Sequence, residues 1–176
     1  KIKATFPINL TVLNLENVHK VKAEFVAHLP RSITHLDFHR AVEVEPTAIS
    51  ALPKHQLKFL NFHYLETLRE SSFLYLPRSL QFLSLASNAH ITDKGIEALP
   101  RNLLHLDLSK TQLTMLGIAA LPSTLGFLSV DVDPTANRIE CIAYLPRGLR
   151  ILNYGGDIRD SWIEFLPPHL QFLNLS

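Results

Sequence analysis

The sequence predicts an α/β solenoid, a curved right-handed stack of units with parallel strands on its concave face and short helices on its convex face. Three observations carry this prediction. The dipeptide Leu-Pro recurs seven times at steps of 21 to 24 residues. The same spacing of apolar residues follows each Leu-Pro, and each of its leucines has an apolar partner three positions earlier. Such a period means that one small unit is copied in tandem. The prolines are Pro30, Pro53, Pro77, Pro100, Pro122, Pro146 and Pro167.

Each Leu-Pro is followed by an apolar triplet whose last two members alternate with one residue between them. This period of two is typical of a half-buried strand. Strands of about four residues, stacked about 4.8 Å apart, would form one parallel sheet of eight strands. The middle members of these triplets are Leu36, Leu60, Leu83, Leu106, Leu128, Leu152 and Leu173, and an eighth triplet, with Leu13 in its middle, precedes the first Leu-Pro.

The second half of each unit contains two apolar residues three positions apart, which indicates at least one helical turn. In the fourth unit we expect Thr92 to cap this helix, with Asp93 in its first turn. Proline then ends the helix and makes the corner toward the next strand. Because helices are wider than strands, the stack must curve with its strands inside. The pairs are Val26/Leu29, Ile49/Leu52, Phe73/Leu76, Ile96/Leu99, Ile118/Leu121, Ile142/Leu145 and Ile163/Leu166.

The strand motif L-x-x-L-x-L, as in Leu103-Leu104-His105-Leu106-Asp107-Leu108, resembles that of leucine-rich repeats over essentially the whole chain. Leu-Pro before this motif looks like the LPX repeats of bacterial effector ubiquitin ligases. Residues 91–96 are similar to the GALA and cysteine-containing repeats of F-box proteins, and residues 29–36 to FNIP repeats. The resemblance implies a binding surface and, as an alternative, the substrate-recognition part of a ubiquitin ligase.

The repeat boundaries define one domain, residues 1–176, of about seven and a half repeats. Since solenoids need polar caps and the last strand motif has none, we expect a fragment of a longer protein. The open last repeat could also support end-to-end association. The repeats are residues 7–29, 30–52, 53–76, 77–99, 100–121, 122–145 and 146–166, with a partial repeat at 167–176.

Many leucine-rich repeats carry an asparagine three residues after the last strand leucine, where it bonds neighbouring loops. Asn88, Thr111, Asp133 and Asp157 occupy this position in the later units and can form such bonds. Val18, Ala41 and Leu65 occupy it in the first three units and cannot. We therefore expect an incomplete polar ladder near the amino end.

Residues beside the buried leucines should form columns on the concave face. The first column is aromatic or apolar where water is expected, which is typical of an interaction site, although cross-strand pairs could equally serve to stabilise the sheet. The second is polar and could be a side-chain ladder across the strands or a source of specificity. The predicted partner-binding residues are His35, Asp37, Phe59, Asn61, Phe82, His105, Asp107, Phe127 and Asp131.

Composition limits the possible partners and the cellular compartment of the protein. A net charge of +1 gives no reason to expect a nucleic acid or an anionic membrane, and no apolar stretch is long enough to span a bilayer. The single cysteine, Cys141, favours a reducing compartment, so we expect a cytoplasmic protein, in the host cytosol for a bacterial effector. Its apolar neighbours indicate a small buried residue.

Enzyme signatures are missing from the sequence, which has no phosphate loop, HExxH or G-x-S-x-G motif. His39 and His63 should be neighbours, but flat neighbours on a sheet rarely converge on a metal ion. We therefore expect no enzyme, cofactor or metal site, and a recognition domain whose concave face binds a protein. A structural scaffold that uses its edges or convex face is the other alternative.

Overall fold

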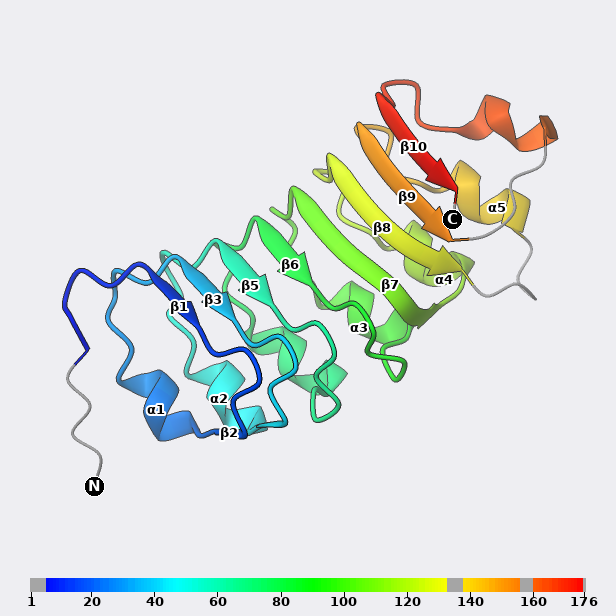
Figure 1. Ribbon diagram of the computed structural model, residues 1–176. Helices are drawn as coiled ribbons and strands as arrows, with labels where there is room; N and C mark the ends of the chain where they lie inside the picture. Colours follow the sequence, from blue (N-terminus) through cyan, green and yellow to red (C-terminus); the bar gives the residue numbers. More distant parts are fainter. Residues whose placement is uncertain (1–5, 133–137, 156–159, 176) are drawn as a thin grey trace.

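The computed structural model describes residues 6–132, 138–155 and 160–175, and these form one elongated stack with strands on one side and helices on the other (Figure 1). All eight predicted strands lie in one parallel sheet, in the order β1-β3-β5-β6-β7-β8-β9-β10. The strands are β1 (Val12–Asn14), β3 (His35–Asp37), β5 (Phe59–Asn61), β6 (Phe82–Ser84), β7 (His105–Leu113), β8 (Phe127–Val132), β9 (Ile151–Gly155) and β10 (Phe172–Leu175). The α/β solenoid predicted from the repeat is confirmed.

The outer side of each repeat carries one short helix. Five are α-helices and two are 3-10 helices in the described chain. They are α1 (Ala23–Ala27), α2 (Pro46–Ser50), η1 (Glu70–Tyr75), α3 (Asp93–Glu97), α4 (Met115–Ala119), α5 (Arg138–Ala143) and η2 (Asp160–Phe165). A second small parallel sheet, β2 (Lys20–Val21) with β4 (Glu43–Val44), joins the first two repeats.

The core is a continuous row of the repeated apolar residues. The central strand leucines from Leu36 to Leu152 are 0% exposed, and the Leu-Pro leucines from Leu29 to Leu145 are all buried. Each buried leucine contributes about 1.5–3 kcal/mol, so every repeat adds its own share of stability. The last strand differs, because Leu173 is 39% exposed and Leu175 is 49% exposed.

Two helix predictions are wrong in detail. Thr92 does precede α3, but its side chain makes no capping bond; its hydroxyl and backbone N–H donate to Glu70 Oε1 at 2.9 and 2.5 Å. Ile163 is 58% exposed, whereas Trp162 is buried. In the described chain no following helix lies over η2, so its outer side chains face solvent.

The polar ladder is incomplete at the amino end, as predicted. The Asn88 side chain is buried, accepts from Leu65 N–H at 2.8 Å and donates to the carbonyls of Phe62 and Leu85, both at 2.8 Å. Val18, Ala41 and Leu65 supply apolar side chains at this position and pack against or within the core. Asp133 and Asp157 lie outside the described residues.

Polar side chains join the helix ends of adjacent repeats, which the sequence did not predict. On the side where helices begin, Asp93 accepts from Thr114 N–H at 2.8 Å and Glu45 accepts from Ala23 N–H at 3.0 Å. On the side where helices end, Arg101 donates to the Ala120 carbonyl at 2.7 Å. Carboxylates thus meet the positive helix ends and cations meet the negative ones.

Candidate protein-binding face

The first predicted column is a straight row across the sheet. The strand pairing aligns His35 with Phe59, Phe59 with Phe82, Phe82 with His105, and His105 with Phe127. Val12 precedes the row on β1, and Ile151 and Phe172 continue it on β9 and β10. The repeat period therefore brings residues more than 90 positions apart into one line.

The five central side chains of this row form a continuous stack of rings, here called the ring stack: His35, Phe59, Phe82, His105 and Phe127. The centroid separations along it are 5.4, 4.1, 4.4 and 3.6 Å. Three of the four pairs are stacked and the Phe82–His105 pair is tilted by 32°. Such cross-strand ring contacts stabilise the sheet, which is the structural alternative to binding that the sequence left open for this column.

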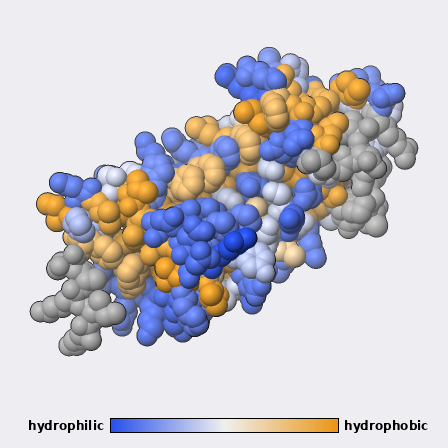
Figure 2. Space-filling view, viewed as in Figure 1, coloured by the Kyte–Doolittle hydropathy of each residue, from blue (hydrophilic) through white to orange (hydrophobic). Residues whose placement is uncertain are grey.

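The ring stack is also partly exposed. Phe59, Phe82, His105 and Phe127 are half-buried and His35 is exposed. Figure 2 shows hydrophobic residues extending along this side of the molecule, interrupted by hydrophilic ones. Burial lowers the pKa of His105, and the nearby Asp107 opposes this shift. Burial between the phenylalanine rings thus disfavours the charged form of the His105 imidazole.

The polar column lies beside the ring stack, and three of its side chains form hydrogen bonds within their own repeats. Asp37 Oδ1 accepts from His39 N–H at 2.8 Å, Asn61 Oδ1 from His63 N–H at 3.0 Å, and Asp107 Oδ1 from Ser109 N–H at 3.1 Å. Each side chain therefore closes a turn in its own repeat. The sequence interpretation of a cross-strand ladder is wrong for these three residues, although their outer carboxylate or amide atoms remain partly exposed.

Asp131 is separate from the ring stack. Its Oδ2 accepts from Lys110 N–H at 2.7 Å, and it lines a polar hollow of about 330 Å³ with Ser109, Ser129 and Asn153. Gly155 faces it on β9, where a Cβ would lie 2.0 Å from Asp131 Oδ1. The predicted residues therefore form one row of rings, one row of turn-forming polar groups and one polar hollow.

His39 and His63 are neighbours, as expected, and their rings stack with centroids 4.6 Å apart and planes 14° apart. Parallel rings direct their nitrogens sideways and not toward a shared ion. Among the described residues no group of three or more His, Cys, Asp or Glu side chains is placed to hold a metal. Burial and the neighbouring His39 lower the pKa of His63.

Two further features bear on the class of protein. Cys141 is fully buried, as its apolar surroundings predicted. Within the ranges that the structure covers, no helix is both long and apolar enough to cross a membrane.

Together these features define a repeat solenoid that presents a strand face, a class that generally serves as a scaffold for interactions. A family model described as "Leucine Rich repeat" matches residues 77–99. This match supports the resemblance to leucine-rich repeats that the strand motif indicated. A search of curated proteins found no match.

Solved structures share the fold at low identity. The leucine-rich-repeat-containing protein LegL7 from Legionella pneumophila is 16% identical, with a TM-score of 0.64, covering 97% of this chain and 67% of LegL7. Internalin C2 from Listeria monocytogenes is 20% identical, with a TM-score of 0.68, covering 94% and 73%. A chain of the TLR13–ssRNA13 complex is 19% identical, with a TM-score of 0.64, covering 95% and 29%.

Proposed function

We propose that the protein is a non-catalytic recognition module that binds a protein partner through the ring stack. One observation carries the proposal: five rings from five strands form an uninterrupted row that is packed on its sides and open on its outer edge. Half-buried aromatic side chains lose little conformational entropy on binding and are favoured as anchors.

The polar column supports a protein partner more than a purely apolar ligand. Asp37 and Asp107 each keep one carboxylate oxygen that forms no hydrogen bond within the described chain. These acceptors lie beside the rings, where they could pair with backbone N–H groups or basic side chains. The chain would then combine apolar anchors with charge complementarity at the rim of the contact.

Affinity capture with the folded protein as bait, followed by quantitative mass spectrometry, tests this function. The variant Phe82→Ala/Phe127→Ala should lose the captured partner while keeping its circular dichroism spectrum. The matched control, Leu116→Ala/Phe165→Ala, removes two exposed apolar side chains from the helical side. Equal capture by the wild type and the ring-stack variant would refute the function.

The two alternatives make different predictions in the same experiment. A substrate-recognition part of a ubiquitin ligase would capture its substrate through the same rings, together with ligase components. A structural scaffold would lose its partner in the helical-side control instead. The cytoplasmic location belongs to this proposal and rests on the single cysteine.

A further inference from the structure

The basic residues of the chain are unevenly distributed. The segments that lead from each helix to the next strand, here called the Leu-Pro rim, contain seven Lys or Arg residues and no Asp or Glu. Because the whole chain carries +1, the rest of it carries −6. The rim consists of residues 28–34, 51–58, 76–81, 98–104, 120–126, 144–150 and 166–171.

All seven cations of the rim are exposed: Arg31, Lys54, Lys58, Arg78, Arg101, Arg147 and Arg150. Three of them have a structural task, since Lys54, Arg101 and Arg147 donate to backbone carbonyls at the end of the next helix. The other four side chains form no hydrogen bond or ion pair within the described residues. Helix capping therefore accounts for less than half of this charge.

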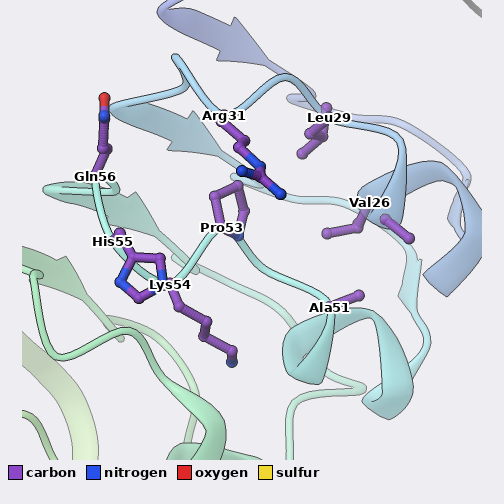
Figure 3. Close-up of a pocket in the computed structure, with 9 residues that line it drawn as sticks. Val26, Leu29, Arg31, Ala51, Pro53, Lys54, His55 and Gln56 are labelled. Atoms are coloured by element: carbon purple, nitrogen blue, oxygen red, sulfur yellow. The ribbon is translucent and has the colours of Figure 1, made fainter.

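A hollow of about 530 Å³ opens on the same rim between its first two segments, residues 28–34 and 51–58 (Figure 3). Arg31, Lys54 and His55 surround it, and Pro53 lies between them. Its apolar lining comes from Val26, Leu29, Ala27 and Ala51 near the ends of α1 and α2. Burial lowers the pKa of Lys54. The hollow thus combines an apolar lining with two basic side chains, Arg31 and Lys54.

We propose that the Leu-Pro rim binds an acidic polypeptide segment that inserts an apolar side chain into this hollow. Carboxylates pair with arginine in a bidentate geometry. Arg31 and Arg78 lie on the first and third segments of the rim, and Lys54 and Lys58 lie on the segment between them. This surface differs from the ring stack, so the two proposals stand independently. The net charge of +1 gives no sign of this basic rim, because the rest of the chain carries −6.

A single-stranded nucleic acid fits the rim less well. Such ligands bind where aromatic side chains are interleaved with cations, because bases stack on the rings. The rim contains one aromatic residue, Tyr144. The hollow is lined by aliphatic side chains, which suit a leucine or valine of a peptide better than a base.

Fluorescence anisotropy with a labelled peptide of Glu-Glu-Leu repeats tests the proposal. We expect saturable binding to the wild-type protein that weakens strongly at high salt, since exposed charges are screened. Arg31→Glu/Arg78→Glu should lower the affinity about tenfold or more. Lys22→Glu/Lys94→Glu makes the same charge change at exposed sites away from the rim and should lower it less than about twofold.

Two further measurements make the outcomes decisive. Ala27→Phe fills the hollow without changing charge and should weaken the Glu-Glu-Leu peptide but not polyglutamate. If Arg31→Glu/Arg78→Glu fails to fold by circular dichroism, Arg31→Gln/Arg78→Gln replaces it. The proposal is overturned by no peptide binding, by equal losses in the rim and control variants, or by tighter binding of oligothymidine or anionic vesicles than of the peptide.

Discussion

His105 and Phe127 lie on neighbouring strands with their ring centroids 3.6 Å apart and their planes 9° apart. Face-to-face contact of this kind buries one side of the imidazole, and Phe82 covers the other at 4.4 Å. The histidine is therefore held in a setting that disfavours its charged form, and burial lowers its pKa from the ordinary value of 6.5.

This burial makes stability depend on pH. Between the lowered pKa of folded His105 and 6.5, the unfolded chain binds more protons than the folded one. The free energy of unfolding should be largest above pH 6.5 and should fall as pH drops through that window. His63 acts in the same direction because its pKa is also lowered. Urea denaturation from pH 8 to 5 measures the effect.

His105→Phe keeps a ring in the stack and should flatten part of this pH dependence. His90→Gln, at an exposed site, is the control for removing a histidine. If the free energy of unfolding of His105→Phe changes with pH as steeply as that of the wild type, the stacked imidazole does not control this dependence.

Phe82→Ala should destabilise the protein without unfolding it. The ring contacts Phe59 at 4.1 Å and His105 at 4.4 Å, and each aromatic pair is worth about 0.5–1.5 kcal/mol. We expect a total loss of about 1–3 kcal/mol in chemical denaturation. Phe172→Ala is the comparison, since that ring is 54% exposed and outside the ring stack. Equal losses at both sites would mean that stacking adds nothing.

Asn88→Ala should lower the free energy of unfolding by more than the small change in side-chain volume suggests. It removes the acceptor of the buried Leu65 N–H and the donor to the carbonyls of Phe62, Leu85 and Ala86, so polar groups are left unsatisfied. The expected loss is about 2–4 kcal/mol in the free energy of unfolding. The control is Asn102→Ala, which removes one exposed bond of 3.3 Å and should cost about 0.5 kcal/mol or less. Similar values for both would contradict the ladder's importance.

Gly117→Ala and Gly126→Ala should differ although the chemical change is identical. A Cβ at Gly117 would lie 2.3 Å from Asp93 Oδ1 and would displace the carboxylate from Thr114 N–H. We expect a loss of about 1–2 kcal/mol there. At Gly126 the nearest atom, the Leu104 carbonyl oxygen, is 3.8 Å away, so the change should be near neutral. Thermal denaturation of both variants distinguishes these outcomes.

The exposed leucines of β10 should promote self-association. Leu173 and Leu175 occupy positions whose counterparts in β9 are 0–1% exposed. Sedimentation velocity should show concentration-dependent dimers that Leu173→Glu abolishes, while Leu116→Glu on a helix leaves them unchanged. A wild-type protein that stays monomeric at high concentration would refute this expectation.

The repeat period allowed the sheet and its columns to be predicted residue by residue. A fixed spacing sets the strand register, so the alignment of Phe59 with Phe82 and of Phe82 with His105 follows from counting. The burial of Leu36 and Leu106 follows from the same alternation. Period alone does not determine side-chain rotamers, so the stacking of these rings could not be read from the sequence.

Contacts between different columns were also beyond sequence reasoning. Thr92 looked like a helix cap because its own helix is adjacent in sequence, yet Glu70 of the preceding repeat accepts its hydroxyl hydrogen. Of the two interpretations left open for the polar column, the cross-strand ladder is not formed at Asp37 and Asp107, whose carboxylates accept from N–H groups two residues later in the same repeat. Strands also lengthen from three residues in β6 to nine in β7, for which the repeat gives no signal.

Seven cations lie along one long side of the stack, so the molecule has a charge asymmetry perpendicular to its long axis. Every further unit of this kind would increase that asymmetry while leaving the net charge nearly unchanged. Far from contact, a charged surface would exert a torque on such a particle and turn it to present one side before any side chain touches. Long-range electrostatics can therefore orient the molecule before it touches a partner, over a distance set by the screening length of the solution.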